Sequence, residues 1–257
     1  MSRIRSKKSI FSNPLVRKVE RFESVYEGDV ATYKGIFIKS IYFILMVLLG
    51  TALAFTLYHS LFVSATVMLA LYAVAIILML VSSIVSAISV KTTPVMGTLG
   101  SLAMGYALAF TGVLIPEYAS YYYLAAVLTL AIVLAMMFVY FSGLVKVTDT
   151  FRKIIYTVLI ASLIGGLLVG VCFLIPATRV AAVLFITNPL ISLLCSVGGI
   201  ILASLFLLSD FNTIERTVMT RLPRDYEWCA SYSLIITVVW LYLEVLDLIL
   251  TIKDMMD

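Results

Sequence analysis

The sequence has few charged residues and almost none of the residues that build metal or redox sites. Only 12% of its 257 residues are charged, which is about half the share found in soluble domains. The three cysteines (Cys172, Cys195 and Cys229) are scattered through apolar stretches, and the one histidine is His59. Because there is no CxxC pair and no histidine cluster, zinc and dithiol sites are excluded and a disulfide framework is disfavoured. We expect no resident cofactor.

The sequence also lacks the signatures of membrane-embedded hydrolases. It contains no HExxH, GxSxG or GxGD motif. Two carboxylates, Glu244 and Asp247, lie well inside apolar runs, and both belong to one run. An aspartyl dyad would therefore have to recruit Asp210 from the run before it. We predict that the protein is not an enzyme.

What the sequence has in abundance is long apolar stretches. Hydrophobic residues make up 63% of the chain, and the mean hydropathy is +1.12. Seven uncharged apolar runs follow one another: Ile41–Tyr58, Leu61–Val90, Val95–Ile115, Tyr118–Val145, Ile154–Ile175, Ala181–Ser209 and Cys229–Ile252. A helix needs about 20 apolar residues to cross a bilayer, and barrel strands need only about 9–11.

The runs predict an all-α integral membrane protein with seven transmembrane helices. The first run is comfortably long if its helix begins at Ile36 and Lys39 extends to the interface. Residues 1–35 then form a basic N-terminal tail, and residues 36–257 form the transmembrane domain. The first run is too long for a signal-peptide core.

The distribution of basic residues predicts the orientation. With the N-terminus in the cytoplasm and seven crossings, sixteen of the eighteen Lys and Arg residues are cytoplasmic, and only Arg179 and Lys253 lie outside. Positive residues favour the cytoplasmic side, so the C-terminus is expected outside. Because no nucleic-acid recognition module accompanies the basic tail, we expect no nucleic-acid partner.

Two glycine pairs predict close helix packing. Gly166 and Gly170 form a GxxxG motif in the fifth run, and Gly198 and Gly199 lie in the sixth. Small residues at this spacing let helices approach closely in a membrane.

Three carboxylates are candidate functional groups. Asp210 is expected to close the sixth span, whereas Glu244 and Asp247 share one face of the seventh. A charge at bilayer depth is costly, so such residues face a protein interior or water. Protonation, a proton shared between carboxyls, or a bound hard cation such as calcium would each stabilise them. Asp210 at the end of its helix and Asp247 at the outer interface could instead simply meet water.

The link between the last two runs is rich in charge. Asp210 and Asn212 have calcium-loop spacing, but the glycine and closing glutamate of an EF-hand are missing. Glu215 and Glu227, with Arg216, Arg224 and Asp225, are interpreted as a solvated, charge-paired cytoplasmic turn. Glu215 and Glu227 remain possible additional carboxylates of a site.

Several segments carry a resemblance to a known family. They are Asp210-Phe211-Asn212-Thr213-Ile214-Glu215-Arg216, Pro223-Arg224-Asp225-Tyr226-Glu227-Trp228, Val239-Trp240-Leu241-Tyr242-Leu243-Glu244, Ser12-Asn13-Pro14, Thr32-Tyr33-Lys34-Gly35 and Val147-Thr148-Asp149 with Phe151-Arg152-Lys153. Together they resemble the Bax inhibitor-1 family, and are closest to its bacterial Bax inhibitor-1 like branch.

The resemblance implies a bundle whose last helix is central and wrapped by the other six. It also implies a pH-sensitive calcium leak across the membrane, placed by the bacterial branch in the bacterial inner membrane. In the better-known branch, two aspartates on the last two helices share a proton and gate the pore. Asp210 matches the first and Glu244 the second, and both would contact calcium transiently. Their separation in this sequence is longer than is usual in the family, by about two helical turns.

Three functions follow as hypotheses. The first is a proton-regulated calcium leak channel that works with lipid, calcium ions and protons alone. The second is a regulator without transport activity, whose tail over residues 1–35 binds a membrane protease or stress-response partner. A proton-coupled small-solute transporter is the third, although the sequence lacks the repeats that are common in transporters.

Overall fold

The computed structural model describes residues 29–59, 64–114 and 119–256, and within these ranges it is all-α. The helices are α2 (Tyr33–His59), α3 (Ala65–Ile88), the 3-10 turn η1 (Val90–Thr92), α4 (Thr93–Leu114), α5 (Ala119–Phe141), α6 (Asp149–Leu174), α7 (Pro176–Ile186), α8 (Pro189–Met219) and α9 (Tyr226–Met256). Most of the predicted tail, the Ser12-Asn13-Pro14 segment and the link at Pro116-Glu117 lie outside the described residues. The all-α prediction is confirmed.

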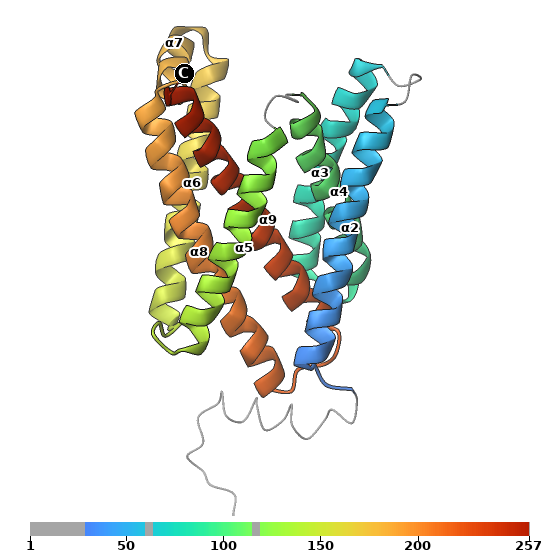
Figure 1. Cartoon of the computed structure of the whole chain (residues 1–257). Coiled ribbons are helices and arrows are strands. Elements are labelled where there is room, and N and C mark those ends of the chain that lie inside the picture. Colours follow the sequence, from blue (N-terminus) through green and yellow to red (C-terminus); the bar gives the residue numbers. More distant parts are fainter. Residues whose placement is uncertain (1–28, 60–63, 115–118, 257) are drawn as a thin grey trace, which may run out of the picture.

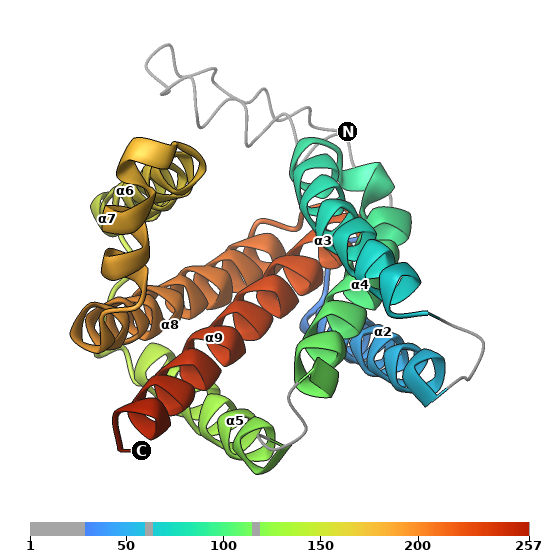
Figure 2. The ribbon, with the colours of Figure 1, turned by 90° about the horizontal axis from the view of Figure 1, so that it is seen from above.

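Helix α9 runs between two groups of helices (Figures 1 and 2). Helices α2, α3 and α4 pack together on one side, and α6, α7 and α8 lie on the other. Helix α5 packs against both α8 and α9. The start of α2 and the start of α9 lie at the same end of the molecule, and α9 ends at the opposite end (Figure 1).

Six of the helices are long and apolar enough to cross a membrane, judged by length and composition among the described residues. These are α2, α3, α5, α6, α8 and α9. Helix α4 has 22 residues and packs between α2 and α3, with further contact to α9. Large apolar side chains such as Phe37, Phe138 and Leu167 remain more than 60% exposed. Exposed apolar surface on this scale marks a membrane-facing protein rather than a soluble one.

Helices α2 and α4 approach closely because α4 carries a stripe of small residues. Gly97, Ser101, Gly105 and Ala109 recur at every fourth position, and Ser101 and Ala109 are buried. A Cβ on Gly105 would lie 1.8 Å from the carbonyl oxygen of Val47 on α2. At this point the backbones can touch because α4 has no side chain there.

The apolar run predicted as one span over Ala181–Ser209 is two helices. Helix α7 ends at Ile186, and α8 begins at Pro189, with Asn188 accepting hydrogen bonds from the backbone N–H groups of Leu190 and Ile191 at 3.0 and 3.3 Å. An asparagine cap followed by proline starts a helix efficiently, so Asn188 interrupts a stretch that is apolar throughout. Helix α8 then continues to Met219. The expectation that Asp210 ends its helix is therefore wrong: Asp210 lies inside α8 and is buried.

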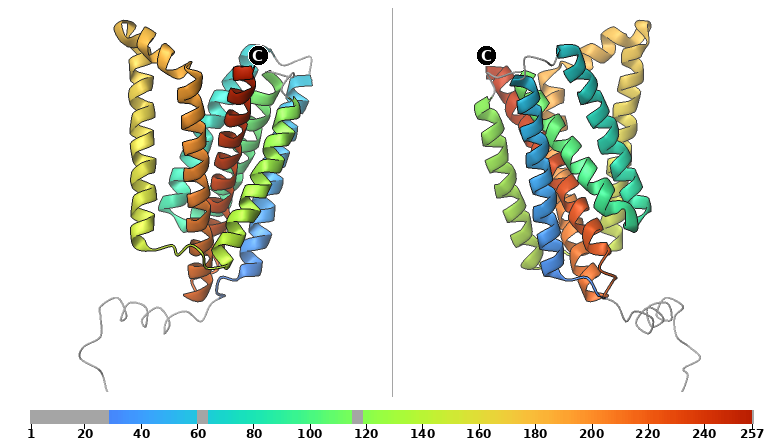
Figure 3. Two further views of the ribbon diagram at one scale, coloured as in Figure 1. Left: turned by 60° about the vertical axis from the view of Figure 1, so that its left-hand side comes forward. Right: turned by 90° about the vertical axis from the view of Figure 1, so that its right-hand side faces the viewer.

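The packing role predicted for the GxxxG motif is also wrong. Among the described residues, nothing lies within 4 Å of a Cβ placed on Gly166, Gly170 or Gly198, whereas a Cβ on Gly199 would meet the Glu244 carboxyl. Helix α6 is joined to α8 through α7 at one end, and it stands apart from the bundle along much of its length (Figure 3). Ile155 is its one buried residue among those described, so its glycines face outward.

Helix α9 is central to only part of the bundle. It packs against α2, α4, α5 and α8, whereas α3 packs mainly on α4, and α6 mainly on α7 and α8. The helix buries one residue in nearly every turn, including Tyr232, Leu241 and Val245. The last helix was expected to be wrapped by all six others, but over the described residues only four of them pack against it.

Candidate functional site: a polar seam between α8 and α9

Helices α8 and α9 are antiparallel and face each other along polar and small residues, which we call the polar seam. The seam comprises Ser192, Ser196, Gly199 and Asp210 on α8, and Ser233, Glu244, Asp247 and Thr251 on α9. The residues of each helix are separated by three, four or eleven positions, so they share one face.

The pairs across the seam keep a constant register. Ser192 pairs with Thr251 at 3.0 Å between hydroxyl oxygens, Ser196 donates to Asp247, Gly199 contacts Glu244, and Ser233 donates to Asp210 at 2.8 Å. Each step forward along α8 is matched by an equal step back along α9. Three carboxyls therefore form one line between the last two helices.

Asp210 is the most buried of the three, with 7% of its surface exposed. Its Oδ1 accepts the hydrogen bond from Ser233, and its Oδ2 is buried without a hydrogen-bond partner among the described residues. The Thr237 hydroxyl and the Arg152 guanidinium of α6 also favour its ionised form. Arg152 itself donates to Asn212 and Thr213 at 2.8 and 3.3 Å. Burial with a missing partner penalises the ionised form of Asp210.

Glu244 and Asp247 lie at the other end of the seam. Glu244 is half-buried and accepts a hydrogen bond of 2.8 Å from the Trp240 indole N–H. Its carboxyl fills the space beside Gly199, where a Cβ would lie 2.1 Å from Oε2. Asp247 is exposed but accepts a hydrogen bond from the buried Ser196 hydroxyl. Among the described residues neither carboxyl forms an ion pair.

The structure does not bring Asp210 and Glu244 together. Asp210 faces Ser233, and Glu244 faces Gly199, so the two carboxyls are about 16 Å apart along the helix axes at 1.5 Å per residue. At this separation they share no proton and bind no common ion. Within residues 29–59, 64–114 and 119–256, no three His, Cys, Asp or Glu side chains are grouped closely enough to hold a metal ion.

Glu227 is not part of a solvated turn, as its charged neighbours suggested. It is 1% exposed and forms an ion pair with Lys39 of α2, which is itself buried. The backbone N–H and hydroxyl of Thr32 donate to Oε1 at 2.8 and 3.1 Å. Lys39 also lies 5.0 Å from the centre of the Trp228 ring. Lys39, which was expected to extend to the interface, instead has a specific partner, the carboxylate of the second residue of α9.

Glu215 belongs to a second polar cluster, at the end of α8 beyond Asp210. It accepts a hydrogen bond from the Tyr140 hydroxyl of α5, which also accepts one of 3.2 Å from the Asn212 side chain. The same Asn212 accepts the hydrogen bond from Arg152. This cluster connects α5, α6 and α8 and is separate from Glu244 and Asp247.

Sequence reasoning identified the carboxyls but missed their partners. Ser233, Thr237 and Thr251 continue the three- and four-residue spacing of Glu244 and Asp247, and that periodicity was available in the sequence. The pairing of Lys39 with Glu227 joins residues 188 positions apart. No local pattern predicts such a contact.

The long apolar helices, the exposed apolar side chains and the polar seam between two of these helices define a multi-pass α-helical membrane protein. Comparison of the sequence with known families gives a match to the family described as Bax inhibitor 1 like, over residues 8–254. The chain therefore belongs to the Bax inhibitor 1 like family, and the resemblance is confirmed. Comparison with curated proteins and with solved structures gives no match.

Proposed function

We propose that the protein is a pH-sensitive calcium leak channel of a bacterial cell membrane, with the polar seam as its ion path. The observation that carries the proposal is the line of three carboxyls, Asp210, Glu244 and Asp247, none of them in an ion pair among the described residues. Unneutralised carboxyls inside a membrane protein mark ion and proton paths, and calcium prefers oxygen ligands of this type.

In this proposal α4 is the seventh span, and the start of α2 faces the cytoplasm. Seven crossings agree with the opposite placement of the start of α2 and the end of α9 (Figure 1). They also keep sixteen of the eighteen basic residues on the cytoplasmic side. The Asp210 end of the seam is then cytoplasmic, and Asp247 is nearer the outer face.

The spacing along the seam favours successive ion contacts over a shared carboxyl pair. Phe206 and Leu207 are buried on α8 between the levels of Asp210 and Glu244, so a continuous path requires α8 and α9 to separate. Ionised Asp210 in its present surroundings lacks a partner for Oδ2. Deprotonation therefore favours a state in which water or calcium reaches that oxygen, whereas protonation favours the packed state.

The sign of the pH dependence follows. At low pH the carboxyls are neutral, the seam stays packed and the calcium flux is small. At high pH the carboxylates attract calcium and the flux rises. Asp210→Asn and Glu244→Gln, which mimic the protonated forms, are expected to give low flux with a flattened pH response.

The test is calcium entry into dye-loaded proteoliposomes, compared at about pH 6 and about pH 8. The matched control is Asp254→Asn, an exposed carboxyl of α9 beyond the seam. It should keep the wild-type response. A Glu244→Gln protein with unchanged pH dependence removes Glu244 from gating. Folded wild-type protein that passes no calcium at either pH refutes the channel and directs attention to a regulator that acts through residues 1–35.

A further inference from the structure

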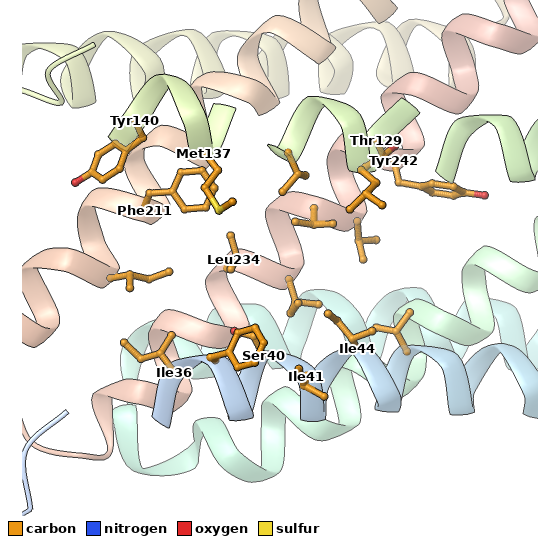
Figure 4. A pocket seen from close by; sticks show the side chains of 18 of the residues that line it. Ile36, Ser40, Ile41, Ile44, Thr129, Met137, Tyr140, Phe211, Leu234 and Tyr242 are labelled. Carbon is orange, nitrogen blue, oxygen red and sulfur yellow. The ribbon is translucent and has the colours of Figure 1, made fainter. Parts of the chain in front are cut away.

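A groove of about 720 Å³ lies between α2 and α5, apart from the polar seam. Ile36, Ile41 and Ile44 of α2 form one wall, Met137 of α5 lies on the other, and Leu234 of α9 lies between them (Figure 4). Both wall helices are candidate membrane spans. The groove is therefore placed where bilayer hydrocarbon is the surrounding solvent.

The groove has the length of a lipid tail. Along α2 its lining runs from Tyr33 to Leu48, which is about 22 Å at 1.5 Å per residue, and the part beyond Tyr33, from Ile36 to Leu48, covers about 18 Å. One leaflet contributes about 15 Å to the hydrocarbon core, half of its thickness of about 30 Å. The lining is apolar over this distance, apart from the hydroxyls of Ser40, Thr129 and Tyr242. Such a channel suits an extended hydrocarbon chain.

Polar side chains gather at one end of the groove. Tyr33 at the start of α2, Tyr140 near the end of α5 and Glu215 of α8 line this end. Glu215 is the one charged residue among the described residues of the lining. Tyr140 donates a hydrogen bond to its Oε2. Tyrosines are enriched at the level of lipid headgroups, so this end corresponds to the membrane interface.

We propose that the groove binds a membrane phospholipid whose headgroup carries an ammonium group. One acyl chain lies between α2 and α5 against Leu234, and the ammonium group lies against the Glu215 carboxylate. The negative charge at the polar end favours a zwitterionic, amine-bearing headgroup over an anionic one. The site does not depend on calcium transport and remains available whether or not the seam conducts.

The test uses the full-length protein reconstituted in nanodiscs of equal parts phosphatidylethanolamine and phosphatidylglycerol. After extraction into detergent, native mass spectrometry counts and identifies the retained lipid. The filling variant is Ala126→Trp, because Ala126 lines the groove. The matched control is Ala135→Trp, an exposed alanine about two and a half turns further along α5 that faces away from the groove.

Wild-type protein and Ala135→Trp are expected to retain phosphatidylethanolamine in preference to phosphatidylglycerol. Ala126→Trp should reduce retention by roughly tenfold or more, since each methylene that loses its contact weakens binding several-fold. Glu215→Gln should retain lipid but lose the headgroup preference. Equal retention by the two tryptophan variants overturns the proposal. A wild-type protein that retains no lipid, or that appears as a dimer without lipid, also overturns it.

Discussion

The α2–α4 pair and the α6–α7 pair show two different uses of glycine in one membrane protein. In α2 and α4, Gly50 and Gly105 lie against carbonyl oxygens of the neighbouring helix, closer than any Cβ would allow. In α6, Gly166 and Gly170 have nothing within 4 Å. The comparison teaches that a glycine motif in an apolar helix indicates close packing only when the chain brings a second helix to it.

The two regions also differ in their polar contacts. The N-terminal side has the buried pair Lys39–Glu227 and the buried hydrogen bond of 2.9 Å between Ser82 and Tyr232. The polar contacts of α6 lie at its two ends, where Arg152 reaches α8 and where Thr178 and Arg179 of α7 donate to the carbonyl groups of Cys172 and Phe173. We therefore expect the α2–α4–α9 group to determine stability, and α6 to tolerate change.

The largest effect is expected from Lys39→Met. Removing Lys39 leaves the buried Glu227 carboxylate with the more distant and largely exposed Arg224 guanidinium at 3.9 Å, and should cost about 3 kcal/mol, the lower end of the range for breaking a buried ion pair. The measurement is thermal unfolding in detergent. Lys34→Met removes an exposed lysine of the same helix and is the matched control. The double variant Lys39→Met with Glu227→Leu should recover much of the lost stability. If Lys39→Met and the control Lys34→Met lose the same stability, the ion pair is unimportant.

A smaller effect, and one of opposite sign in the two regions, is expected from glycine-to-alanine changes. Gly105→Ala forces a methyl group onto the Val47 carbonyl and should destabilise by about 1–3 kcal/mol. Gly166→Ala meets open space and should stabilise by up to about 1 kcal/mol through helix propensity. The same unfolding measurement compares them. Shifts of the same sign would contradict the contrast between the two helix pairs.

The smallest effect is expected from removing a tyrosine hydroxyl. Tyr232→Phe loses the buried hydrogen bond to Ser82 and should cost about 1 kcal/mol. Tyr156→Phe, on the half-exposed ring that packs against Phe206, should change stability by less than about 0.5 kcal/mol. If Tyr156→Phe is the more damaging, α6 is held to the bundle more tightly than its packing indicates.

The sequence predicts the helices well because hydrophobic length is a local property. The second run was expected over Leu61–Val90, and α3 covers Ala65–Ile88. Hydropathy does not reveal the break at Asn188, because long apolar stretches flank it on both sides. The small-residue stripe of α4 is visible in the sequence at every fourth position. It indicates the close helix contact that the shorter GxxxG motif of α6 was expected to make. Sequence spacing shows that a face is small, but not which helix meets it.

The site was predictable in its carboxyls but not in their arrangement. The position of Asp210 opposite Ser233 depends on the register between α8 and α9, and that register is set by the turn over residues 220–225 and by packing along both helices. Glu227 looked solvated because its neighbours Arg224 and Asp225 are polar. Its burial results from α2, which is remote in sequence.

The contact between Lys39 and Glu227 has a consequence for how the protein is made. Lys39 enters the membrane with the first helix, and Glu227 leaves the ribosome only with the last. Two hydrogen bonds also wait for α9: Thr32 donates to Glu227, and Ser231 donates to the carbonyl group of Ile36. A lysine at the centre of a lone helix costs about 2.5–3.5 kcal/mol on insertion scales, and Lys39, near the start of α2, costs less than this. During synthesis α2 therefore carries an unpaired charge until α9 arrives, and a chain that stops before α9 presents that charge to the cell's quality-control machinery.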